Sequence, residues 1–357
     1  MTAGRPTRRL VTGALHAVPG LASSRERLGA AVVGLLTDGQ GGVDPAAVTE
    51  FDHPGDPGLH GPGSITWRVH ADLSMLVGGI RALLVQALHP LAMTGVARHS
   101  NFRKDPLGRL ARTGAYVGVT TFGSVPEAEQ MVAMVQAVHR VVEGTAADGR
   151  HYSASDPATL AWVHNVEIDS FLRAYERYGA EPLHEADADR YVEEQSRVLA
   201  LFGVEDPRLV PRTRADLERW ILTHPEQTRI PETLEAVRFV MLPPMPRTTL
   251  PVYSVLSAAA VGLIPVRQRR MLGLATPVPF SALDRLGPVG AGTGRVLQGA
   301  ADRVEGISAG VFDAVAVKPS AQTLMGVLGW ALGPESPSLQ LAERRVAARP
   351  TAPTDGD

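Results

Sequence analysis

The sequence predicts an all-α protein, most simply one large helical domain with appended segments. Three observations carry this prediction. Apolar residues recur at helical spacing over most of the chain, helix-capping residues precede several of these stretches, and no strand pattern of comparable strength competes with them. The chain has 357 residues, 44% of them hydrophobic and 20% charged, which is enough to bury a core with a pocket.

The composition excludes several classes of function. Lysine and arginine total 35 against 37 acidic residues, so the chain lacks the positive charge of a general nucleic-acid binder. The sequence has no cysteine, which excludes disulfides, thiolate catalysis, iron–sulfur clusters and Cys-ligated metals. A metal would therefore need His, carboxylate, Tyr or Met ligands.

The hydropathy and the cysteine count also bear on location. The longest apolar runs are shorter than the roughly 20 residues that span a bilayer, so we expect no transmembrane segment. The run over 251–265 is followed by arginines at 267, 269 and 270, which leaves peripheral membrane association open. The absence of cysteine fits a reducing compartment, and we expect a cytoplasmic protein.

The first predicted elements lie in the N-terminal third. Residues 1–63 are expected to hold an N-terminal helix and then a loop, because 38–64 are rich in Gly, Pro and Asp. From Ser64 to Gly95 the apolar residues keep helical spacing, which predicts one long, buried helix with a kink or break at Pro90. Residues 97–107 are polar and predict a connector.

Capping residues mark the helices that follow. Ser124 starts a predicted helix that runs to about residue 142. Asp156 before Pro157 marks the clearest helix of the sequence, which ends at Gly179. Further helices are predicted at 185–202, 213–223, 231–241 and 249–263. We expect 246–346 to form a C-terminal helical extension and 347–357 a disordered tail.

Two helical histidines are the first candidates for chemistry. His139 and His164 each share the apolar stripe of a predicted helix, so both imidazoles should point inward. A buried imidazole needs a hydrogen-bond partner or a metal, because burying its nitrogens unpaired costs a few kcal/mol, on the order of 2–7. Each histidine is therefore either a satisfied core residue or a ligand.

A basic segment lies upstream of His139. Arg109, Arg112 and Thr113 form an R-x-x-R-T run whose helical spacing places them on one side. Two arginines on one side can bind a carboxylate such as a haem propionate. The alternative is a solvated basic face.

Several motifs together resemble a known family. The segments WRVHADLSMLVGGIRALLVQALHPLAMTGVARHSNF, DPLGRLARTGAYVGVTTFG, VHRVVEGT and YSASDPATLAWVHNVEIDSFLRAYERYG occur in one order between about residues 60 and 245. They resemble the bacterial members of the mpaB-type oxygenase family, which shares its catalytic domain with the latex-clearing rubber oxygenases. The resemblance implies a catalytic domain over 64–245.

The resemblance also implies a site. It implies a globin-like helical core that binds one b-type haem, with His139 as the axial iron ligand. Arg109, Arg112 and Thr113 would then line the haem, with Arg112 and Thr113 near the reacting side, and His164 would support it. The implied activity is that of a haem-dependent oxygenase acting with dioxygen on a small apolar substrate, isoprenoid or lipid-like.

The sequence departs from the family pattern at four places. Arg112 stands where the rubber oxygenases have a lysine, and the stretch from His89 to Thr94 offers no carboxylate where they have a glutamate that acts as a base. Gln136 and Glu143 stand where related sequences tend to have arginines. Cleavage of polyisoprene by that mechanism is therefore not expected.

Two alternatives stay open. His139 with Glu143 and His164 with Glu167 are each about one helical turn apart, which is compatible with a carboxylate-bridged non-haem metal site, provided that both glutamates are buried. A second alternative is a non-catalytic protein that binds haem or an apolar ligand. Tyr152, Trp67 and Trp162 are predicted to be core or pocket walls.

Overall fold

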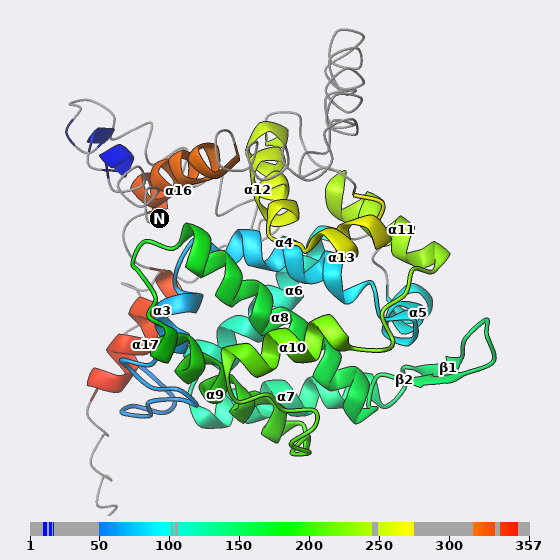
Figure 1. The fold of residues 1–357 in the computed structure, drawn as a ribbon. Coiled ribbons are helices and arrows are strands. Elements are labelled where there is room, and N and C mark those ends of the chain that lie inside the picture. Colours follow the sequence, from blue (N-terminus) through cyan, green and yellow to red (C-terminus); the bar gives the residue numbers. More distant parts are fainter. Residues whose placement is uncertain are drawn as a thin grey trace, which may run out of the picture.

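Helices dominate the computed structural model, which describes residues 10–12, 14–15, 17, 50–100, 103, 106–244, 249–274, 317–332 and 336–348 (Figure 1). Within these residues the only strands form one short hairpin, so the predicted all-α class is confirmed. The predicted N-terminal helix and lead-in loop fall mostly, and the predicted tail almost wholly, outside the described residues.

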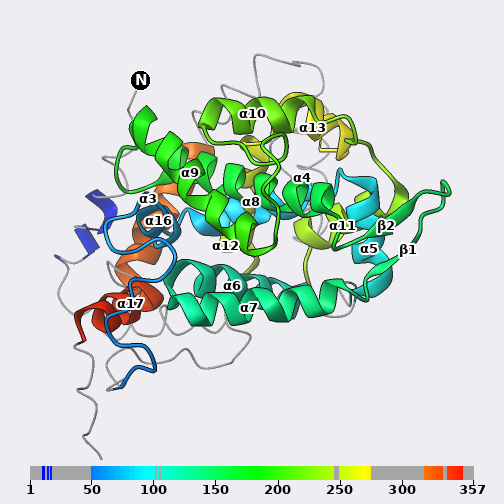
Figure 2. The same cartoon turned by 90° about the horizontal axis from the view of Figure 1, so that it is seen from below.

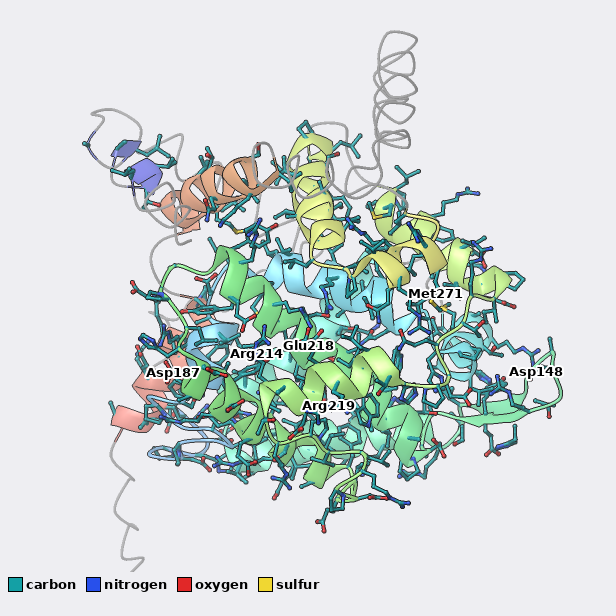
Figure 3. All side chains as sticks on the ribbon, in the orientation of Figure 1. Asp148, Asp187, Arg214, Glu218, Arg219 and Met271 are labelled. Atoms are coloured by element: carbon teal, nitrogen blue, oxygen red, sulfur yellow. The ribbon has the colours of Figure 1, made fainter. Side chains whose placement is uncertain are left out.

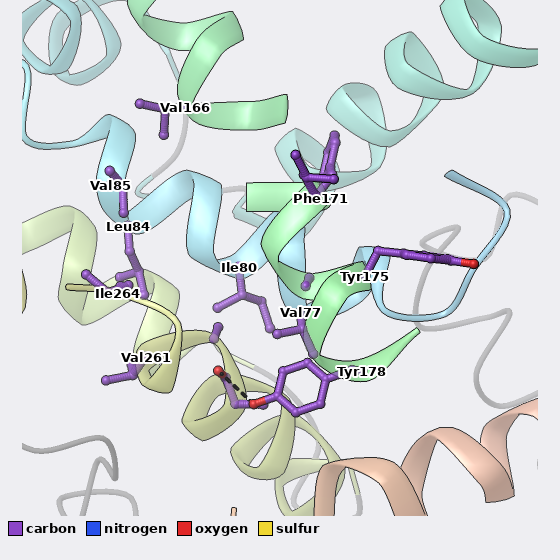
Figure 4. Close-up of a cluster of buried hydrophobic side chains, with 14 of the residues drawn as sticks. Val77, Ile80, Leu84, Val85, Val166, Phe171, Tyr175, Tyr178, Val261 and Ile264 are labelled. Carbon is purple, nitrogen blue, oxygen red and sulfur yellow. Dashed lines mark hydrogen bonds between the residues drawn. The ribbon is translucent and has the colours of Figure 1, made fainter. Parts of the chain in front are cut away.

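The centre of the fold is a crossing of long helices. Helix α8 (Pro157–Tyr178) packs along α4 (Met75–Gln86), and α4 also packs on α12 (Leu250–Gly262) (Figure 4). Gly78 makes the first contact close, because a Cβ atom there would lie 2.8 Å from Cδ1 of Phe171. Tyr178 extends the cluster to α12 by donating a hydrogen bond to the carbonyl of Ala259. These three helices thus form the centre of the main apolar core, to which several surrounding helices add further buried residues.

Local sequence explains why α8 forms where it does. The side chain of Asp156 accepts a hydrogen bond from the backbone of Thr159 at 2.8 Å, and Pro157 occupies the first turn. Gly179 follows the last helical residue. These are the signals that predicted the helix, and both predicted ends are confirmed.

A buried ion pair joins α4 to the middle of α8. Arg81 is 1% exposed, and its Nη2 lies 2.8 Å from Oδ2 of Asp169. Its Nη1 donates to Oγ of Ser170 at 2.6 Å. Arg173, one turn further along α8, also pairs with Asp169 at 2.9 Å. The carboxylate is therefore paired twice, as a buried charge must be.

The long helix predicted from Ser64 to Gly95 is broken into three. Helix α3 (Ile65–His70) ends before Asp72, whose carboxylate accepts from the backbone of Ser74 at 2.8 Å and from that of Ala180 at 3.1 Å. The second break is the predicted one: His89 is extended before Pro90, and α5 (Pro90–His99) leaves α4 at 103°. Helical spacing continues through both breaks, which is why the first could not be detected.

Helices α6 (Pro106–Phe122) and α7 (Val125–His139) lie side by side along one face (Figure 2). Ser124 starts α7 with a capping box to Glu127, as its position predicted. The helix ends at His139, three residues before the predicted end. The chain then enters a hairpin of β1 (Glu143–Thr145) and β2 (His151–Ser153), which is too short to give a strand pattern in the sequence.

The remaining helices surround this framework. They are α9 (Glu185–Leu201), α10 (Arg214–Thr223), α11 (Pro231–Met241), α13 (Val266–Met271), α16 (Lys318–Leu332) and α17 (Pro337–Ala347). Helix α10 covers α8 and carries an ion pair between Arg214 and Glu218 at 3.2 Å (Figure 3). Helix α17 packs on α6, where the buried Arg345 donates to the carbonyl of Phe122 at 2.8 Å. In the described part of the chain, no unbroken helix has the length and apolar composition of a membrane span; only α4 and α5 taken together, across their sharp bend, do.

Candidate functional site

One large cavity, of about 440 Å³, opens between α5, α6, α7, α8, the end of α9 and β2. Its walls are mainly aliphatic. The apolar lining comprises Leu91, Ala92, Val96, Val135, Val138, Val142, Ala154, Leu160, Val163, Leu199 and Phe202. Val138, on α7, is 59% exposed and also borders the cavity, so solvent reaches this rim. A cavity of this size and character suits a small apolar ligand.

The structure brings four of the five predicted site residues to this cavity. Arg112 and Thr113 reach it from α6, His139 from α7 and His164 from α8. Arg109 lies on α6 one turn before Arg112, but its side chain lies outside the described residues. Side chains as much as 52 positions apart in the sequence thus meet around one space, and the roles given to them stay predictions.

His139 occupies the last residue of α7. Its imidazole stacks on the ring of Phe202, with 6.4 Å between centroids and 26° between planes. Its Nδ1 atom is buried and has no hydrogen-bond partner among the described residues. Burial lowers the pKa of His139, because desolvation penalises the imidazolium. The ring is therefore neutral at pH 7, the form that can bind a metal.

His164 is held more tightly on α8. Burial lowers its pKa to about 4, so this imidazole is neutral as well. Its Nε2 atom is buried and has no partner in the described part of the chain. A hydrogen bond to the backbone of Gln195 on α9 opposes the effect of burial and thus favours the protonated ring. The partner that raises the pKa in this way is the backbone carbonyl, which accepts a hydrogen bond from the ring.

Glu167 is a cavity residue that sequence reasoning considered only as a ligand of a non-haem metal. It lies one turn after His164 on α8 and lines the cavity. Burial raises the pKa of Glu167 to about 7, because desolvation penalises the charged carboxylate. The side chain is half-buried and lines the cavity.

Tyr116, Tyr152 and His99 also belong to the polar lining, most of which sequence reasoning left unassigned. Tyr116 lies one turn after Thr113 on α6, so helical spacing from the predicted residues could have identified it. Tyr152 was predicted as a wall, and its hydroxyl lies 3.0 Å from Nε2 of His99. His99 ends α5, where no pattern marked it.

The alternative of a non-haem metal site is not supported by the arrangement. That alternative required both glutamates to be buried. Glu143 is exposed on β1 and does not line the cavity. Across the described residues, no group of three or more His, Asp and Glu side chains could hold a metal ion. This alternative placed His139 and Glu143 one turn apart on the same helix. Helix α7 ends at His139, so the two side chains do not share a helix.

Fold and site together define a helical protein with an apolar, histidine-bearing cavity built on α6, α7 and α8. Comparison with known protein families then identifies the family. Residues 67–296 match the family described as "ER-bound oxygenase mpaB/B'/Rubber oxygenase, catalytic domain". The match covers more than half of the chain, so the protein belongs to this family, as its motifs indicated.

Individual relatives add little about activity. Uncharacterised proteins of Mycobacterium bovis and Mycobacterium tuberculosis are each 31% identical to this chain over 121 residues. The aligned part is 34% of this chain and 47% of each relative, so the chain spans about half the length of these proteins. No solved structure matches the chain.

Proposed function

We propose that this protein is a haem b-dependent oxygenase that uses dioxygen on a small apolar substrate. The family to which the chain belongs is described by its oxygenase catalytic domain, which supports the reaction class. The observation that carries the haem assignment is the neutral imidazole of His139, which borders an apolar cavity together with Arg112 and Thr113.

The residues around the cavity fit a haem in three respects. His139 offers a neutral imidazole, whose buried Nδ1 atom is unpaired within the described residues. The aliphatic walls suit a porphyrin, which is largely apolar. Arg112 stands exposed at the border of the cavity, where a guanidinium can meet a propionate that faces solvent.

Each residue then has a defined task. His139 would hold the iron, and Arg112, with Arg109 as the family resemblance implies, would bind the propionates. The aliphatic side chains of α5, α7 and α8 exclude water and hold an apolar substrate. Thr113 supplies a hydroxyl at the wall, and His164 supports the site from α8. A bound haem supplies the redox chemistry of dioxygen.

The absorption spectrum of the purified protein, as isolated and after titration with hemin, tests the haem assignment. We expect a Soret band that saturates at one hemin per chain in the wild type and is lost or shifted in His139→Ala. His184→Ala is the matched control, because His184 is exposed before α9 and does not line the cavity. A wild-type protein that binds no hemin would refute the assignment. Equal spectra of the wild type and His139→Ala after titration with hemin would also refute it.

Oxygen uptake by the haem-loaded protein tests the reaction. An oxygen electrode follows consumption with a series of apolar olefins, beginning with squalene in detergent, each against the His139→Ala variant. Uptake that depends on both olefin and His139 supports an oxygenase. Tight hemin binding without uptake for any olefin assigns the protein to the non-catalytic binders instead.

A further inference from the structure

A second, much smaller space adjoins the large cavity between α3, α6, α8 and α9. We call it the small chamber. Its volume is about 10 Å³, close to the roughly 10–15 Å³ that one water molecule requires. Its polar walls are His70, Tyr116, Thr120, His164, Glu167 and Gln195. A space of this size with so many polar groups is suited to a single water.

Three side chains belong to both spaces. Tyr116 from α6 and His164 and Glu167 from α8 line the large cavity and the small chamber alike. They therefore form the partition between the two. A group in this partition can exchange a proton with a ligand on one side while its other side contacts the chamber.

Most polar groups of the small chamber already have partners. His70 uses both ring nitrogens, with Nδ1 2.7 Å from Oγ1 of Thr121 and Nε2 2.8 Å from the hydroxyl of Tyr191. Nε2 of Gln195 donates to Oγ1 of Thr66 at 3.1 Å. Thr120 donates to a carbonyl of its own helix. These groups leave few bonds for a water to make.

The groups that remain are those of the partition. Nε2 of His164 is buried and unpaired among the described residues. The ring is neutral, so with its proton on Nδ1 it presents Nε2 as an acceptor. No hydrogen bond or ion pair to the carboxyl group of Glu167 occurs in the described part of the chain. A chamber water can donate one hydrogen to Nε2 of His164 and the other to the Glu167 carboxylate, and it can accept from Tyr116.

Among the described residues, no cation forms an ion pair with the carboxyl group of Glu167. The elements packed against it present Tyr116 from α6, His70 from α3 and Tyr191 from α9, all uncharged at pH 7. His164 and His139 are neutral as well. Arg112, the arginine among the described lining residues, is exposed at the cavity border. The carboxyl group is thus held where both of its protonation states are accessible near neutral pH.

We propose that Glu167 is the proton donor of the large cavity, and that a water in the small chamber, shared with His164, stabilises its carboxylate. In the step, the O–H bond of the Glu167 carboxyl group breaks, and a new O–H bond forms on a ligand oxygen that carries negative charge. The charge moves to the carboxylate, which accepts a hydrogen bond from the chamber water. Solvent entering past the exposed rim returns the proton.

The use of this proton rests on the proposed function, but the state of Glu167 can be measured without haem. Infrared difference spectra of the apoprotein report the carbonyl stretch of a protonated carboxyl group as pH is varied across 7. We expect a band that disappears with a midpoint near pH 7 in the wild type and is missing from Glu167→Gln. Glu143→Gln is the control, because Glu143 is exposed and outside both spaces.

Kinetics of the haem-loaded protein test the transfer itself. Oxygen uptake by the wild type should fall as pH rises through 7, because only the protonated carboxyl group donates. Glu167→Gln should lose this pH dependence and at least about 100-fold in rate, while Glu143→Gln keeps both.

Either measurement can overturn the inference. An infrared band that persists in Glu167→Gln refutes the inference. Oxygen uptake by Glu167→Gln that keeps the pH profile of the wild type refutes it as well. A protein that binds no hemin refutes the proposed function instead, since the infrared titration of the apoprotein still decides whether Glu167 holds a titrating proton.

Discussion

Gly78 and Gly79 are adjacent in α4 and provide a sharp test of how α4 packs on α8. A Cβ at Gly78 would lie 2.8 Å from Cδ1 of Phe171 and 3.1 Å from the carbonyl oxygen of Ser170. Favourable carbon contacts lie at about 3.5–4.0 Å. A Cβ at Gly79 meets nothing within 4 Å. The same substitution therefore has opposite consequences at two neighbouring positions.

The magnitude follows from two effects. Replacing a helical glycine by alanine stabilises a helix by about 1 kcal/mol, and this gain applies at both positions. At Gly78 the new methyl group must displace a core ring and the backbone of α8, which costs about 1–3 kcal/mol. Gly78→Ala should therefore be less stable than Gly79→Ala by about 1–3 kcal/mol, and Gly79→Ala should be more stable than the wild type.

Urea unfolding followed by circular dichroism measures this difference. We expect the midpoint of Gly78→Ala to fall below that of Gly79→Ala, with equal slopes so that the shift reports stability. A midpoint for Gly78→Ala at or above that of Gly79→Ala would show that α4 and α8 do not approach as closely as described.

Two further predictions concern buried charge on α8. Arg81→Met should lower the free energy of unfolding by about 3 kcal/mol. This is the low end of the range for a broken buried ion pair, because Asp169 keeps Arg173 as its second partner. A loss below about 1 kcal/mol in urea unfolding would contradict this prediction. Glu167→Gln should stabilise the protein at high pH. The pKa of Glu167 rises from 4.5 to about 7 on folding, so the wild type loses stability as pH rises between these values, by at most about 3 kcal/mol. The urea midpoints of the wild type and Glu167→Gln should therefore move apart as pH rises through this range and keep a constant difference above pH 7. A difference that is constant at all pH values would contradict the raised pKa of Glu167.

Features fixed by neighbouring residues were predicted well from the sequence. Asp156, Pro157 and Gly179 mark both ends of α8, and the capping box of Ser124 marks the start of α7. These signals depend on hydrogen bonds within one turn of the helix, so they can be recognised in the sequence without knowledge of the fold. The inward direction of His139 and His164 was predictable for the same reason, from helical spacing.

Features that depend on distant contacts were not predicted. The break after α3 requires Asp72 to bind the backbone of Ala180, which lies 108 residues further along the chain. Glu167 was proposed as a metal ligand because Glu143 shows a similar spacing from a histidine. Only the fold shows that one glutamate is half-buried beside the cavity and the other is exposed on a hairpin.

The partition between the large cavity and the small chamber has a consequence for the size of ligand that the protein accepts. It consists of side chains, while the backbones of α6 and α8 are fixed by packing elsewhere in the core. A smaller residue in place of Tyr116 would join the two spaces without moving a helix. The depth of the site, and with it the length of an accepted molecule, can thus change by single substitutions while the architecture is retained.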